Sequence, residues 1–441
     1  MFRIFKRTHP LYRPREISRE ELPWMLRRNV WTATLGTIAI GNLTGGPFFT
    51  AYCQEMGMPQ YMFGLLTTFM MLMTFLMLLS PAIEEHFGQR KYPWFVFATA
   101  SRSVFAIFIL GLFVKLNPWI IVLTIVGWAA LANLASPLWE SWAWSYIPGR
   151  RFARFWARRN FWCTLALTAS ALAVAPIINH MPHEGRAMGI SALFAVLLVV
   201  GMLDVLFHVK IPESPRQARP AGSLSKIREA FSNPPFRLWV FAVAVWYFGV
   251  MVAGPFCLPY MLYDLGFKDD FFIYTVLTTA LPAACTLLTL RYWGRAVDSR
   301  YRGTIVVVSS VFWTAIPLFY FLATPQNSIR MLGAAWIIGG IFPFGVILAV
   351  PLITKSLSGE DKTMPAAIVS IAANVGMMFG AGLGTFIARA YSVRDTFAVS
   401  LVLRAVGAFL FFLIMVYRPL GREKANQLPL QALAGRINTG G

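Results

Sequence analysis

The stretch MGISALFAVLLVVGMLDVLFHVK (188–210) decides the fold class of this chain of 441 residues. It is apolar on all sides, and Asp204 is its single acidic residue. A helix rises about 1.5 Å per residue, so about 20 apolar residues cross the roughly 30 Å hydrocarbon core of a membrane. The stretch therefore predicts a membrane-spanning helix.

Similar stretches recur along the whole chain, which is 57% hydrophobic and 13% charged, with a mean hydropathy of +0.60. These values are too apolar for an ordinary soluble protein. A membrane β-barrel would instead show segments of about ten residues that alternate between apolar and polar. We predict an all-α membrane protein with twelve spans, near 29–53, 59–83, 92–115, 118–147, 160–180, 188–210, 238–263, 270–293, 304–324, 329–355, 365–388 and 396–418.

The positions of the basic residues predict the orientation. Of the 39 Lys and Arg, 31 fall in segments on the side of the N-terminal tail, six fall on the opposite side, and Arg102 and Arg404 lie inside spans. Cytoplasmic loops carry an excess of Lys and Arg, so we expect both termini in the cytoplasm. The net charge of +20 then reflects topology and contact with anionic lipid rather than nucleic-acid binding.

Two short patterns occur once in each half of the chain. The sequence GPF at 46–48 recurs at 254–256, each time at the outer end of a predicted span. In each copy an acidic residue stands two positions before a later glycine, as Glu55 and Gly57 in the first and Asp264 and Gly266 in the second. The repeat predicts two related six-helix halves.

The second pattern is a charged loop after the second and eighth spans, PAIEEHFGQRK (81–91) and GRAVDSRYRG (294–303). A carboxylate at one helix end can pair with arginines on a neighbouring end and hold one conformation. The alternative is a pair of turns whose charges only set topology. The latch candidates are Glu84, Glu85, Gly88, Arg90, Lys91, Gly294, Asp298, Arg300 and Arg302.

With these features the chain resembles the major facilitator superfamily across its span region. In that family the loop reads glycine, three residues, aspartate, then glycine and basic residues; Gly294 and Asp298 fit, whereas Ser80 replaces the first glycine. The string LLSPAIEEHFGQRK (78–91) is most similar to a bacterial branch whose solutes we do not assign. The resemblance implies transport of a small solute by alternating access, along a path that spans one, four, seven and ten line.

We expect the following organisation: a cytoplasmic N-terminal tail (1–28), a six-helix bundle (29–210), a cytoplasmic linker (211–237), a second six-helix bundle (238–418) and a cytoplasmic C-terminal tail (419–441). The tail at 1–28 lacks the pattern of a cleaved signal peptide. The expected location is a bacterial inner membrane, and the expected state is a monomer surrounded by lipid.

Ionisable side chains inside spans are costly and are candidate functional groups. Arg102 and Glu140 lie at depths of about 15 and 12 Å by helical rise, so they could meet. In one reading Glu140 takes up a proton or pairs with a substrate cation; in the other the two residues form a permanent structural pair. We interpret Asp204 as a local partner near a span end and Arg404 as a helix-pairing residue.

Further substrate or coupling candidates lie on spans expected to line the path: Asn42, Asn133, Trp144, Trp246, Tyr247 and Trp336. Any one aromatic residue among them could equally serve packing. The glycines between 376 and 384 form a small-residue face that predicts close helix packing.

Absent motifs limit the alternatives. The chain has no GxxxxGK and no HExxH, and its cysteines stand singly, so we predict no cofactor, no metal site and no enzymatic activity. His180, His183 and Glu184 are read as ordinary loop residues. We predict a secondary active transporter with protons as a candidate coupling ion, a symporter or permease. The open alternatives are an uncoupled facilitator, a lipid or lysolipid flippase, and a non-transporting sensor or scaffold.

Overall fold

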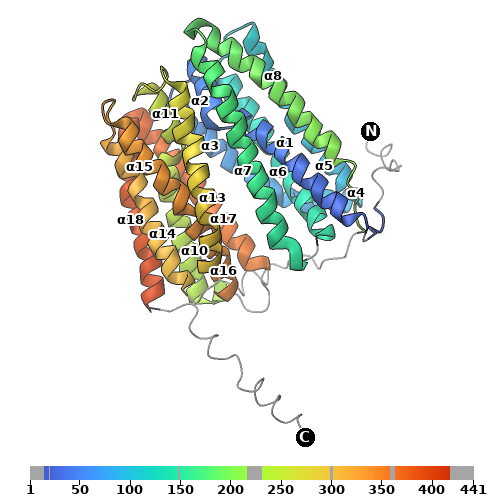
Figure 1. Cartoon of the computed structure of the whole chain (residues 1–441). Coiled ribbons are helices and arrows are strands. Elements are labelled where there is room, and N and C mark those ends of the chain that lie inside the picture. The colour runs from blue at the N-terminus through green and yellow to red at the C-terminus, as the bar shows by residue number, and fades with distance from the viewer. Residues whose placement is uncertain are drawn as a thin grey trace.

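The computed structural model describes residues 14–18, 20–147, 149–215, 231–297, 301–357 and 363–417. Within these ranges all regular elements are helices, arranged as a first half (22–208) and a second half (234–417) that stand side by side (Figure 1). The first half contains α1 (Leu22–Leu43), α2 (Gly46–Glu55), α3 (Tyr61–Met73), η3 (Thr74–Leu79), α4 (Ser80–Phe87), α5 (Lys91–Ser103), η4 (Val104–Leu112), α6 (Pro118–Tyr146), α7 (Gly149–His180) and α8 (His183–His208). The second half contains α10 (Pro234–Ala253), η5 (Gly254–Phe256), α11 (Cys257–Tyr263), α12 (Phe271–Thr275), η6 (Val276–Ala280), α13 (Leu281–Val297), α14 (Arg302–Leu322), α15 (Ser328–Ile341), α16 (Pro343–Leu357), α17 (Thr363–Ala390) and α18 (Val393–Tyr417).

Eleven helical stretches among the described residues are long and apolar enough to span a membrane. The predicted first span (29–53) is the exception, because its helix α1 also contains Arg27 and Arg28 and is separated from α2 at Thr44 and Gly45. Gly46 has φ +73, a backbone conformation that residues with a Cβ rarely adopt. The predicted helical membrane fold is thus confirmed, with its first span kinked.

The predicted internal repeat is visible in the backbone. The second GPF forms η5, a single 3-10 turn between α10 and α11, and so interrupts its span as the first copy does. Gly57 and Gly266, which follow the two copies, have φ values of +77 and +79. Both copies therefore end in the same left-handed glycine turn.

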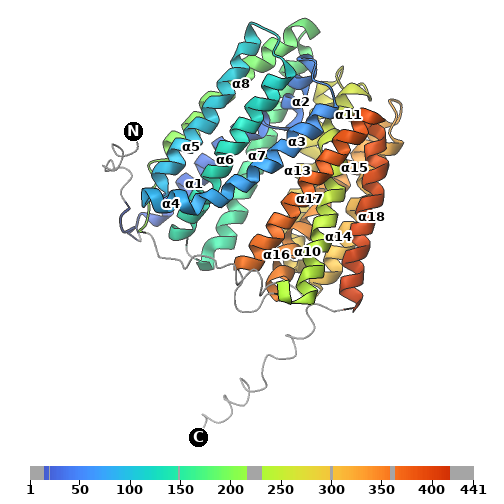
Figure 2. The ribbon, with the colours of Figure 1, turned by 180° about the vertical axis from the view of Figure 1, so that it is seen from behind.

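The two halves meet at one end of the molecule, which we call the closed end (residues 44–60 and 254–271). The opposite end, where α1 begins and α18 ends, is the tail end. Figures 1 and 2 show the helices of the first half leaning away from the second half towards the tail end. The hydrogen bonds that join described residues of the two halves all lie near the closed end; they are Gln54 to the Leu262 carbonyl, Gln60 to Asp264, Tyr263 to the Met58 carbonyl, the Phe271 N–H to Asn179, and Arg186 to the Lys268 carbonyl.

The second half is packed through a glycine seam. A Cβ atom on Gly376, Gly380 or Gly384 of α17 would collide with a backbone carbonyl of α10. Their spacing of four places all three on one helix face. The small-residue face of the sequence is therefore a packing surface, as predicted.

Candidate functional site

A cavity of about 380 Å³ lies inside the first half, between α1, α5, α6, α7 and α8. Small residues of α1, among them Gly36 and Gly41, leave room for it, and tryptophans of α5 and α6 line it. The described residues of the second half do not contribute to its wall. Its ionisable and aromatic lining residues are Arg102, Arg159, Asp204, His208, Trp94, Trp128 and Trp139.

Arg102 and Asp204 form an ion pair in this cavity, with 3.3 Å between the guanidinium and the carboxylate. A Cβ on Gly36 would lie only 2.6 Å from Asp204, so this glycine makes room for the carboxylate. The predicted meeting of Arg102 with Glu140 is wrong: helix α8 packs against α5 and brings Asp204 to the arginine, whereas Glu140 is exposed on α6. Asp204 is a cavity residue rather than a local partner at a span end.

His208 closes the cavity towards the tail end through a chain of hydrogen bonds. Trp139 donates to His208 Nε2 at 2.9 Å, and an indole can only donate, so the ring proton lies on Nδ1. That nitrogen donates to Thr32 Oγ1 at 2.8 Å, and the Thr32 hydroxyl donates to the Asn29 carbonyl at 3.1 Å. The imidazole is therefore a neutral, fixed group that positions Trp139.

Arg159 supplies the cation with no close partner. Its guanidinium carbon lies 4.9 Å from the ring centre of Trp139 and 4.8 Å from that of Trp156, and the two rings are stacked with centroids 5.7 Å apart. Its Nε is buried without a hydrogen bond. Within the described ranges Arg159 has no ion pair; Asp204 and Glu140 act on it only at longer range.

Sequence reasoning missed Arg159, Asp204 and His208 as site residues. It counted Arg159 among the topological charges, placed Asp204 close to the end of its span and did not single out His208. One signal was present: RFWARRNFW (154–162) surrounds its arginines with aromatic residues, a composition that favours cation–π contacts.

The other predicted substrate candidates are not among the lining residues of this cavity. Asn42 and Asn133 donate to carbonyls of their own helices at 2.7 and 2.8 Å. Trp246 is fully buried in the core of the second half against Trp313 and Phe411. Tyr247 and Trp336 are half-buried beside second-half core residues, and the side chain of Trp144 lies outside the described residues.

Known proteins resemble this chain in sequence over its second half and in fold over most of its length. Residues 247–436 match the family described as Major Facilitator Superfamily. Helices of a mutant of the nucleoside transporter NupG superpose with a TM-score of 0.70 at 11% identity, covering 88% of this chain and 99% of that one. No curated protein sequence matches significantly.

By sequence the second half resembles the major facilitator superfamily, and the whole chain has the fold of that superfamily. Its long apolar helices identify it as an integral membrane protein. Two further structures share the fold. An inward-facing, occupied structure of a bacterial homologue of the human lysosomal transporter Spinster has TM-score 0.64 and 16% identity, covering 90% of this chain and 97% of its own. The inward-open xylose transporter XylE from E. coli has TM-score 0.62 and 12% identity, covering 88% and 96%.

The superfamily-type loop of the first half forms a closed network within that half. Glu213, which follows α8, accepts from the Arg90 side chain at 3.0 Å and from the backbone N–H groups of Arg90 and Lys91 at 2.9 and 3.1 Å. Arg90 also donates to the Ser141 carbonyl of α6 at 3.0 Å. Glu84 lies 4.0 Å from Arg90. The loop therefore ties α4, α5 and α6 to the start of the linker.

The corresponding loop of the second half differs. Gly88 has φ +66 and ends α4, whereas Gly303 is a buried residue within the first turn of α14. Gly294 lies inside α13 and Arg302 begins α14; Asp298 and Arg300 fall outside the described residues. Because two of the latch candidates lie outside the described residues, the latch between the halves stays a prediction.

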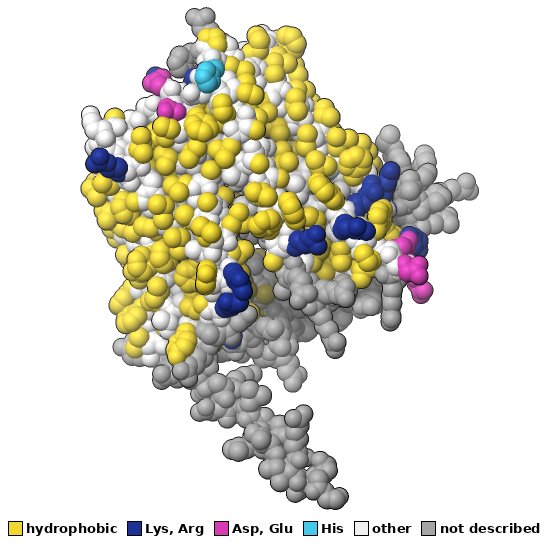
Figure 3. Space-filling model, viewed as in Figure 1, with side chains coloured by type: hydrophobic (Ala, Val, Ile, Leu, Met, Phe, Trp, Pro, Cys, Tyr) yellow, Lys and Arg dark blue, Asp and Glu magenta, His cyan; other side chains and the backbone are white. Residues whose placement is uncertain are grey.

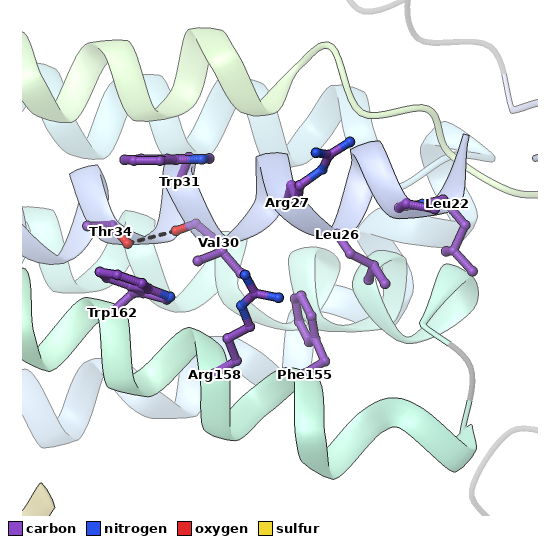
Figure 4. Close-up of a pocket in the computed structure, with 10 residues that line it drawn as sticks. Leu22, Leu26, Arg27, Val30, Trp31, Thr34, Phe155, Arg158 and Trp162 are labelled. Carbon is purple, nitrogen blue, oxygen red and sulfur yellow. Dashed lines mark hydrogen bonds between the residues drawn. The ribbon is translucent and has the colours of Figure 1, made fainter. Parts of the chain in front are cut away.

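A second hollow, of about 550 Å³, lies on the outside of the first half between α1 and α7 (Figure 4). Arg158 projects into it from α7 and extends towards Val30, between Phe155 and Trp162 (Figure 4). Arg158 and Arg159 thus lie on opposite sides of the contact between α1 and α7. We call this hollow the outer groove; its lining residues are Leu22, Pro23, Leu26, Arg27, Val30, Trp31, Thr34, Phe155, Arg158 and Trp162.

Proposed function

We propose that this protein is a secondary active transporter that carries a small organic anion, such as a carboxylate or phosphate ester, by alternating access. The observation that carries the proposal is Arg159: a cation of the cavity lining that lies against two stacked tryptophans, without an ion pair among the described residues. We also propose that the chain acts as a monomer in a bacterial inner membrane. Both termini would lie in the cytoplasm, because most basic residues fall on their side of the membrane.

The charges of the cavity favour an anion. Its lining contains Arg102, Arg159 and Asp204, and His208 is neutral, so the lining carries one positive charge in excess. Such a charge is costly in a partly desolvated space unless a counter-ion joins it. A carboxylate or phosphate suits the flat guanidinium, which can donate two parallel hydrogen bonds. The tryptophans would cover the apolar part of the solute, and about 380 Å³ falls in the range of small-molecule sites.

The proposed coupling ion is a proton, and Glu140 is the residue that would bind it. It is exposed on α6 and acts on Arg159 from beyond ion-pair distance. An ionised Glu140 competes with the solute for Arg159, and a protonated Glu140 does not. Proton uptake at Glu140 therefore strengthens binding of the anion, which is the linkage that a proton symporter requires.

Alternating access agrees with where the halves are joined. With both termini cytoplasmic, the closed end is the outer end, and the present arrangement opens the first half towards the cytoplasm. Rocking of the halves would break the contacts near the closed end and join the tail ends.

The first experiment measures binding. Purified protein is titrated with matched anionic, neutral and cationic solutes, such as a carboxylate, its amide and the corresponding amine, and the thermal shift is recorded. Only the anion should stabilise the protein. Arg159→Gln should weaken anion binding about 10- to 100-fold, as expected for a hydrogen bond to a charged group, and Arg158→Gln is the matched control on the other side of α7. Stabilisation by the neutral or cationic solute alone would refute the anion proposal.

The second experiment measures transport in proteoliposomes with an imposed pH gradient. We expect accumulation of the anion in the wild type and equilibration without accumulation in Glu140→Gln. Accumulation that survives this substitution would refute coupling through Glu140. Equilibration in the wild type as well would identify an uncoupled facilitator.

A further inference from the structure

The outer groove has a composition that its neighbours do not explain. Trp31 is 70% exposed and Trp162 44% exposed, although both are large apolar side chains. Arg27 and Arg158 are exposed and form no ion pair with any described residue. Arg28, next in sequence, is instead held by the Phe207 carbonyl at 2.7 Å. The groove therefore combines exposed aromatic rings with two guanidinium groups that can bind an anion from outside the protein.

The groove lies at a defined level of the membrane. The hydrophobic span of α7 runs from Phe155 to His180. Arg158 and Trp162 are three and seven residues into it, hence about 5 and 10 Å from its end by helical rise. That is the layer where lipid headgroups give way to acyl chains. Figure 3 shows Lys and Arg side chains along the tail-end margin of the same face, below a surface that is mainly hydrophobic.

From these observations we propose that the outer groove binds one anionic phospholipid. Its phosphate is held by Arg158 in the groove and Arg27 at the groove margin, and an acyl chain lies along Val30, Trp31 and Trp162 towards the closed end. Figure 4 shows these side chains. The groove offers both halves of such a ligand in the order in which a lipid presents them: cations at the headgroup level and aromatic rings deeper. Basic pockets between spans on the cytoplasmic side are suited to anionic headgroups.

The charge count favours an anionic over a zwitterionic lipid. A zwitterionic headgroup brings its own cation next to the phosphate and so cancels much of the attraction. An anionic headgroup leaves its full charge for the two arginines, each contributing about 1 kcal/mol near the surface. The site is separate from the substrate cavity, because the α1–α7 contact divides Arg158 from Arg159. The inference does not depend on the proposed transport function.

The test is lipid retention. Purified protein is loaded with phosphatidylglycerol or phosphatidylcholine, stripped stepwise with detergent, and examined by native mass spectrometry. The wild type should retain one phosphatidylglycerol that the double variant Arg27→Gln/Arg158→Gln loses, with about 30-fold weaker binding from two lost charges. The matched control is Arg291→Gln/Arg295→Gln, which removes two exposed arginines near the tail end of the second half and should keep the lipid.

Three outcomes would overturn the proposal. The first is equal retention by the wild type and the groove variant. The second is an equal loss in the control variant, which would indicate attraction by overall charge. The third is release of the lipid by free glycerol phosphate at similar concentration, which would show an anion site without a lipid chain. Trp31→Ala/Trp162→Ala keeps both arginines and should also lose phosphatidylglycerol. Retention by it would remove the acyl-chain half of the inference.

Discussion

The two halves of this protein use equivalent helix pairs in different ways. In the second half, the seventh and eleventh spans, α10 and α17, are pressed together through Gly376, Gly380 and Gly384. In the first half, the corresponding first and fifth spans, α1 and α7, meet with arginines and tryptophans beside the contact, which leaves the cavity on one side and the outer groove on the other. The equivalent pair of spans is therefore closely packed in the second half, whereas in the first half it borders two hollows, the cavity and the outer groove.

The buried arginines follow the same division. Arg404 of α18 is 3% exposed and donates to Ser400 at 3.0 Å, the Trp313 carbonyl at 3.2 Å and the Val250 carbonyl at 3.1 Å. Its donors are used in joining α18 to α14 and α10. Arg159 of the first half has no such partners among the described residues. We infer that Arg404 contributes to stability and Arg159 to ligand binding.

The largest expected effect comes from breaking the glycine seam. Gly380→Ala would push a methyl group into the Phe248 carbonyl, and overpacking of this kind costs about 1–3 kcal/mol. The matched control is Gly382→Ala, because a Cβ there meets only Thr68 Oγ1, at 3.9 Å; it should be neutral or slightly stabilising. Thermal unfolding of the purified variants measures the difference. Equal melting temperatures would mean that α10 and α17 are not in close contact.

The second prediction separates the two arginines. Arg404→Gln should lower the free energy of unfolding by about 2–4 kcal/mol, because it removes charge-assisted hydrogen bonds between helices, while anion affinity stays close to that of the wild type. Arg159→Gln should do the reverse. Thermal unfolding and anion titration on the same preparations check both. A loss of anion binding in Arg404→Gln without unfolding would contradict the division of roles.

Part of this division could be read from the sequence and part could not. The spans, the repeated GPF turn and the glycine face of α17 follow from local patterns, because residue type and spacing determine them. The partners of Arg102, Arg158 and Arg159 do not. Adjacent arginines on a helix point about 100° apart, and only the packing of α1 on α7 sends one outwards and the other into the cavity. Asp204 meets Arg102 because α8 packs on α5, a pairing that span depth alone does not reveal.

The third prediction changes the charge of the cavity without touching Arg159. Asp204→Asn leaves Arg102 without its counter-ion, so the excess positive charge of the lining rises from one to two. We expect anion binding to tighten about tenfold, as a charge at this range allows, and the protein to become less stable because Arg102 is left unpaired. Isothermal titration and thermal unfolding report the two effects. Weaker anion binding in a folded variant would argue that Asp204 itself holds the solute.

The smallest expected effect concerns the contact between the halves at the closed end. Partial burial raises the pKa of the Asp264 carboxyl above its ordinary value, and the hydrogen bond from Gln60 only partly offsets this. Opening this end would return the carboxyl to water and to an ordinary pKa of about 3.9. The closed arrangement therefore binds the proton more tightly, and its population rises as the pH falls through the window between these two pKa values. Above that window the population should not depend on pH. Because Asp264 is partly exposed, we expect a shift of less than about tenfold in the equilibrium between the closed and open arrangements.

Spin labels at Asn117 and Gln326, in a background without native cysteines, would report the distance across the closed end. Asp264→Asn should remove the pH dependence; a wild-type shift in the opposite direction, or one that persists in this variant, would assign the titration to another group.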